Sequence, residues 1–185
     1  MAVSLFGLGV AVAFLSEVML FDAFGENALG DETVNSLETI GSIIGSTPVL
    51  GAIVIFFNNL LAGLIMFGFG AILSIVPVFA LLLNGFLVGD VTSALLADGI
   101  TLDFVLMGLL PHGIPELFAI FVFAGLGMKL GWHALKPFKG KTRKDSVMYI
   151  LGEMKAVIVP MIVLLFIAAI IEVFVSKNLL LFFYS

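Results

Sequence analysis

The sequence predicts an all-α protein, a polytopic bundle of membrane-spanning helices that forms one membrane domain over residues 1–185. Of the 185 residues, 62% are hydrophobic and 11% are charged, and the mean hydropathy is +1.27. Soluble domains have about 45–50% apolar and about 25% charged residues. Cysteine is absent, which excludes disulfides, thiolate metal ligands and thiol catalysis.

Five apolar segments have the length that an α-helix needs to cross a bilayer, about 20 residues. The second and third follow each other closely and predict a tight helical hairpin. The first has no basic residue ahead of it and no small-residue cleavage site, which argues against a cleaved signal peptide. The five predicted spans are residues 3–21, 49–67, 71–89, 115–134 and 155–176.

Charged residues are sorted between the connecting loops. Residues 22–47 and 90–103 contain acidic residues but no lysine or arginine, whereas residues 136–144 contain five basic residues. Cytoplasmic loops carry an excess of lysine and arginine. We therefore expect the loop 135–152 and the N-terminus in the cytoplasm of a multi-pass cell-membrane protein, and the C-terminus outside.

Two further segments are not predicted to span. Val34, Leu37, Ile40 and Ile44 recur at helical spacing, which indicates an amphipathic helix on the outer surface. The segment 101–110 is too short to cross. Because prolines disrupt a helix, Pro111 and Pro115 predict a broken or re-entrant segment before the fourth span.

Glycines recur at intervals of four residues, as in Gly41/Gly45, Gly85/Gly89 and Gly127/Gly131. Small residues at this spacing let membrane helices approach closely. Packing within one chain is favoured over a dimer motif.

Polar residues inside the predicted spans fall near one level. Ionisable groups at membrane depth are costly and are functional-site candidates. At about 1.5 Å rise per residue, most of them lie within roughly 8 Å of one plane near the outer surface. A shared polar pocket is therefore predicted from Glu17, Asn58, Asn59, Asn84, His112, Glu116 and Glu172.

Each of these residues also has a purely structural interpretation. Glu17 and Glu172 could be interfacial acids, Glu116 could stabilise a helix N-terminus, and the asparagines could bond neighbouring helices. Alternatively, His112, Glu116 and Glu172 could ligate a divalent metal ion that activates water. The single histidine makes this a weak signal, since zinc hydrolases usually supply two or three. A His–Glu pair could also relay protons in a transporter.

The chain resembles the stage II sporulation protein M family of integral membrane proteins over essentially its whole length. The resemblance rests on Asn58-Asn59, Asn84-Gly85 with Gly89, Pro111-His112-Gly113 with Glu116, Ala124-Gly125-Leu126-Gly127 and Ala168-Ala169-Ile170-Ile171-Glu172. It implies a membrane protein that, in sporulating bacteria, scaffolds a complex with cell-wall hydrolases. Relatives occur in organisms that do not sporulate, so sporulation itself is not implied, and neither is an enzymatic activity.

The leading hypothesis is a non-enzymatic membrane scaffold or accessory subunit. Its expected partners are the lipid bilayer, proteins of a membrane complex or further copies of the chain, and not nucleic acid. The first alternative is an intramembrane metal-dependent hydrolase that uses His112, Glu116 and Glu172. The second is a small transporter or channel subunit, although no inverted repeat is visible between the first and last spans.

Overall fold

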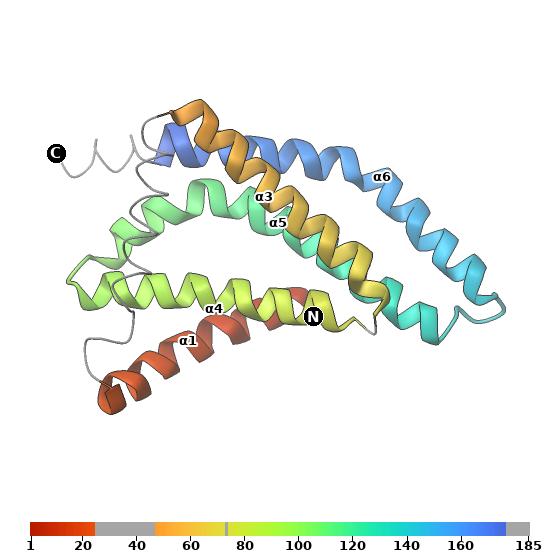
Figure 1. Ribbon diagram of the computed structural model, residues 1–185, viewed down its shortest axis with the longest axis horizontal. Helices are drawn as coiled ribbons and strands as arrows, with labels where there is room; N and C mark the ends of the chain where they lie inside the picture. Colours follow the sequence, from red (N-terminus) through yellow and green to blue (C-terminus); the bar gives the residue numbers. More distant parts are fainter. Residues whose placement is uncertain (25–46, 73, 177–185) are drawn as a thin grey trace.

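The computed structural model describes residues 1–24, 47–72 and 74–176, and these residues are helical apart from short connections (Figure 1). The predicted all-α membrane bundle is thereby confirmed. The predicted amphipathic helix around Leu37 lies outside the described residues. The helices are α1 (Ala2–Phe24), α3 (Pro48–Gly68), α4 (Ile75–Ala97), α5 (Leu102–Leu135) and α6 (Arg143–Ile170), with a 3₁₀ turn η1 (Phe69–Ala71) and a π-helix η2 (Ile171–Ser176).

Four segments of the described chain are long and apolar enough to cross a membrane: Pro48–Ala71, Ile75–Ala97, Leu102–Leu135 and Arg143–Ser176. The N-terminal helix α1 is apolar over Ala2–Leu15 and has 23 residues in all. Twenty residues span about 30 Å, so α1 also has the length of a membrane helix. Its role as a fifth span remains a prediction.

The long helix α5 lies at the centre of the bundle and contacts α1, α3, α4 and α6 (Figure 1). One core cluster joins α3, α5 and α6 around the fully buried Phe123 and Leu165. A second joins α1, α3, α4 and α5 around Met66 and Leu81. The two clusters place α3 and α6 on one side of α5, and α1 with α4 on the other.

Glycine explains how closely these helices approach. A Cβ atom added at Gly85 would collide with the Phe6 carbonyl of α1, and one at Gly127 would collide with the Met66 carbonyl of α3. Neither glycine could be replaced without moving a helix. The glycine spacing in α4 and α5 thus serves packing within the chain, as the sequence predicts.

The connection between α3 and α4 is tight. Ser74 has a left-handed backbone (φ 62°), and its hydroxyl group donates a hydrogen bond of 2.9 Å to the Met128 carbonyl of α5. Pro77 lies in the first turn of α4, where a missing N–H costs nothing. The helix therefore runs over Ile75–Ala97, four to eight residues later than the predicted span 71–89.

The predicted break before the fourth span is not present. α5 is one helix of 34 residues that contains both Pro111 and Pro115, and the predicted short segment 101–110 forms its first turns. Each proline removes a single N–H donor, and neighbouring helices in membrane proteins can compensate for the freed carbonyl groups. Figure 1 shows α5 curved rather than interrupted.

The basic loop is also shorter than residues 135–152, because α6 begins at Arg143. Thr142 and Asp145 form a capping box, in which each side chain bonds the other's backbone N–H. Nearby, Lys129 of α5 forms an ion pair of 2.7 Å with Glu153 of α6. The cap and the ion pair fix the end of the bundle that carries the basic residues.

Candidate functional site

A polar cavity of about 330 Å³ lies between α3, α5 and η2. It is lined by Val54, Ile55, Asn58 and Asn59 of α3, His112 and Glu116 of α5, and Glu172 of η2. All three elements belong to apolar segments long enough to span a membrane. The cavity therefore gathers five of the seven polar residues that the sequence singles out.

Two of these residues owe their proximity to the continuity of α5. His112 and Glu116 are four residues apart, so in an uninterrupted helix they lie one turn apart on the same face. The Glu116 carboxyl group accepts a hydrogen bond from the Asn59 side chain of α3. The His112 ring also bonds the Gly108 carbonyl one turn earlier.

The π-helix η2 supplies the third wall. Nδ1 of His112 lies 3.1 Å from Oγ of the buried Ser176, at hydrogen-bond distance. Glu172, four residues before Ser176, lies close enough to Glu116 for their charges to interact. Single π-helical turns within α-helices are rare and frequently mark functional sites. One hydrogen bond thus ties α5 to η2 beside a pair of carboxyl groups.

Two predicted site residues are not in this cavity. Asn84 of α4 donates a hydrogen bond of 2.7 Å to the Ala80 carbonyl of its own helix. It lines a second cavity, apolar and about 390 Å³, between α4 and α5, and this cavity shares His112 with the polar one. Glu17 belongs to α1, which packs on α4, and its side chain lies outside the described ones.

The metal hypothesis concerns three of the side chains that line the polar cavity. His112, Glu116 and Glu172 line one cavity, but no three histidine, cysteine or acidic side chains of the described residues are grouped as metal ligands. The metal site stays a prediction. The side chains of the cavity form a hydrogen-bonded polar cluster with two carboxyl groups.

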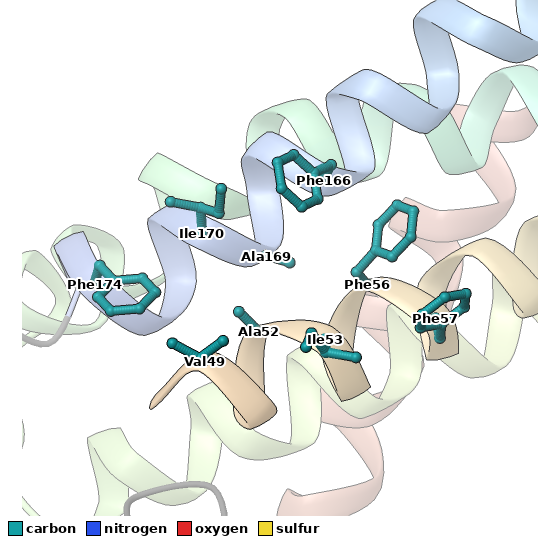
Figure 2. A pocket seen from close by; sticks show the side chains of 9 residues that line it. All are labelled: Val49, Ala52, Ile53, Phe56, Phe57, Phe166, Ala169, Ile170 and Phe174. Atoms are coloured by element: carbon teal, nitrogen blue, oxygen red, sulfur yellow. The ribbon is translucent and has the colours of Figure 1, made fainter. Parts of the chain in front are cut away.

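A third cavity, about 310 Å³ and almost entirely apolar, lies on the opposite face of α3, between α3 and α6. Figure 2 shows Phe56 and Phe57 of α3 with Phe166 of α6 around it. The rings of Phe56 and Phe166 meet edge to face, with centroids 5.7 Å apart. η2 contributes Phe174 to this groove and Glu172 to the polar cavity, so it borders both.

The sequence reasoning missed Ser176. Its four-residue spacing from Glu172 is a signal that could have revealed it, since residues four apart on a helix share a face. Ser176 stands at the predicted end of the last span, and a serine at such a position does not by itself indicate a site.

The family model described as "Stage II sporulation protein M" matches residues 2–177. The chain belongs to this family. Comparison with curated proteins and with solved structures gives no match. The match covers α1 to η2, so it includes every element of this stage II sporulation protein M family member that lines the polar cavity.

Proposed function

We propose that this member of the stage II sporulation protein M family is a non-enzymatic scaffold or accessory subunit of a membrane complex, with the polar cavity as its interaction site. The observation that carries the proposal is the cavity itself. Its side chains bond one another across three elements, through Asn59–Glu116 and His112–Ser176.

The position of the cavity supports an interaction role. Asn58 is the eleventh of the 21 residues of α3, at the midpoint of a helix just long enough to cross the bilayer. A polar group in hydrocarbon without a partner costs several kcal/mol. The Asn58 amide therefore requires a polar neighbour at this depth, whether a partner, water or another copy of the chain.

We also propose that the N-terminus and the basic loop 136–142 face the cytoplasm and that the C-terminus is external. Five basic residues lie between Lys136 and Lys144, and cytoplasmic loops are enriched in such residues. The directions of the helices support the same scheme. In Figure 1, α1, α4 and α6 run one way and α3 and α5 run the other, as alternating spans would.

Co-purification tests the scaffold. The chain, extracted from its native membranes in a mild detergent, is expected to elute with a reproducible and stoichiometric protein partner in quantitative mass spectrometry. Glu116→Gln is expected to reduce the partner's recovery, whereas Asp98→Asn, at the exposed end of α4, leaves it unchanged. A wild-type chain that elutes without any stoichiometric partner would exclude the scaffold.

The alternative is an intramembrane hydrolase. The shared location of His112, Glu116 and Glu172 favours it, and the absence of a metal-ligand group among the described residues counts against it. It requires bound metal in the purified protein. Metal analysis after saturation with zinc, manganese or iron decides the point, and a protein that retains none of them eliminates the hydrolase.

A further inference from the structure

The polar cavity has polar groups that the described part of the chain leaves without partners. Glu116 is bonded by Asn59, but Asn58 and Glu172 have no hydrogen-bond partner within residues 47–72 and 74–176. Asn58 is exposed, and Glu116, Asn59 and Glu172 are half-buried, so the cavity is open on one side. Lipid tails cannot satisfy these groups, so the open side must face water or a polar partner.

The charge of the cavity points to a cation. Its lining contains two carboxyl groups and one histidine, and no lysine or arginine. The basic residues of the described spans lie at the opposite end of the bundle. Lys129 there is already paired with Glu153. The remaining basic residues of the described spans are exposed, and they lie within residues 136–144 or, as Lys155, about three turns into α6. Charged side chains inside membranes almost always pair with one another, which makes a basic group the complementary ligand.

Apolar surface on both sides of the opening has the form of a helix-docking site. On α3, Val54, Asn58 and Leu61 form one exposed stripe at helical spacing. On α4, Leu87 and Val91 are exposed beside the apolar cavity that shares His112 with the polar one. Figure 1 shows α3 and α4 joined at one end and diverging towards the other, with α5 alongside both.

A free metal ion or a small amine would leave these apolar stripes uncovered, whereas a helix covers them and places one side chain into the cavity. A second copy packed parallel to the first does not bring the basic residues of its described spans to this depth, because they lie towards the other end of its bundle. The occupant with the matching chemistry is a transmembrane helix of another protein.

We propose that a transmembrane helix of a partner protein docks over the open side of the polar cavity between α3, α5 and η2 and places a lysine or arginine side chain beside Glu116 and Glu172. The inference rests on the proposed scaffold function and specifies how that scaffold recognises a partner. Recognition then depends on one buried charge pair, with Asn58 as a further hydrogen-bonding group, while the apolar stripes give the helix its orientation.

Synthetic peptides test this without any native partner. The probes are two 23-residue leucine–alanine helices that differ only at the central position, lysine in one and leucine in the other. The protein contains no cysteine, so a fluorophore on Lys139→Cys, in the basic loop, reports binding by energy transfer in phosphatidylcholine vesicles. The lysine peptide is expected to bind about tenfold more tightly than the leucine peptide.

The variants assign the effect to the cavity. Glu116→Gln with Glu172→Gln is expected to abolish the preference for lysine, whereas Asp98→Asn removes a charge at the same end of the bundle and preserves it. Asn58→Leu, on an exposed position that folding tolerates, is expected to reduce the preference several-fold. It serves as the second probe if the double variant proves unstable.

Several results would overturn the inference. These are equal binding of both peptides, an unchanged preference in the double variant, or full displacement of the lysine peptide by butylammonium at comparable concentration. A native partner that co-purifies equally with wild type and double variant would leave the scaffold standing and remove this docking site. A wild type that binds the lysine peptide but has no native partner would support the docking site and exclude the scaffold function.

Discussion

At the scale of single residues, Ser176 links η2 to α5 through one side-chain contact. It is buried at the end of η2 and contacts Nδ1 of His112, 64 residues earlier in the chain. This contact fixes the imidazole ring at the boundary between the polar cavity and the apolar cavity of α4 and α5. The orientation of His112 therefore depends on where the last helical turn ends.

We expect Ser176→Ala to lower the free energy of unfolding by about 0.6 kcal/mol, with an upper limit near 1.7 kcal/mol, as for other interhelical hydrogen bonds in membranes. His112→Ala costs more, because it also empties part of the cavity wall. The measurement is reversible unfolding in mixed micelles, with both single variants and the double variant.

Thr92→Ala is the matched control, because its hydroxyl group bonds only the Val88 carbonyl of its own helix. A coupling energy between His112 and Ser176 that is indistinguishable from zero would mean that the contact does not hold the ring.

At this scale the sequence predicts some site residues and not others, and the difference has a physical reason. Charged and amide side chains in an apolar segment are conspicuous because their burial is costly, and His112, Glu116, Glu172, Asn58 and Asn59 could be identified in this way. Serine and glycine are common in membrane helices, so Ser176 does not stand out. The position of Asn84 in the structure is not predictable in this way, because its depth in the span does not reveal that its amide group bonds the backbone of its own helix.

At the scale of the elements, α5 owes its position to glycine. Gly127 touches the backbone of Met66 and Phe67 in α3, whereas Gly125, two residues earlier, has no atom within 4 Å of an added Cβ. The same residue type thus has opposite roles within one turn. Only the contacts of the neighbouring helix distinguish them.

Gly127→Ala is expected to destabilise the protein by about 1–3 kcal/mol, because the new methyl group forces the α3 backbone away. Gly125→Ala is expected to stabilise it by about 0.5–1 kcal/mol, since alanine is the better helix former and no contact is disturbed. Both are measured by the same unfolding assay. If the two substitutions had equal effects, close backbone contact between α3 and α5 would be wrong.

The prolines of α5 show where local reasoning fails for an element. From the sequence, Pro111 and Pro115 predict a break, because each removes a backbone donor and disfavours the helical conformation before it. In the structure they lie within one helix that packs against four others along its length. Tertiary packing outweighs the local preference, and the sequence does not record how many neighbours a helix has. The capping box at Thr142 was available from the sequence, and it sets the start of α6 earlier than hydropathy does.

At the scale of the whole molecule, polar groups divide between the two ends of the bundle. The five basic residues within 136–144 and the Lys129–Glu153 pair occupy the end where α5 joins α6. The polar cavity lies towards the other end, where the described connection between α4 and α5 carries Asp98 and no basic residue. The sequence predicts this sorting well, because it depends on composition alone and not on packing.

The side of the membrane that each end faces is open to a direct test with single cysteines, since the chain has none of its own. In intact cells, a cysteine at Lys141 or Ser4 is expected to resist a membrane-impermeant maleimide, because both positions lie at the predicted cytoplasmic end. A cysteine at Asp98, exposed at the far end of α4, is expected to react. All three should react once the membrane is permeabilised.

Labelling of Lys141→Cys but not Asp98→Cys would invert the orientation and place the polar cavity nearer the cytoplasm. Labelling of Ser4→Cys and Asp98→Cys, with Lys141→Cys protected, would instead show that α1 does not span, because the N-terminus would then lie on the same side as the far end of α4.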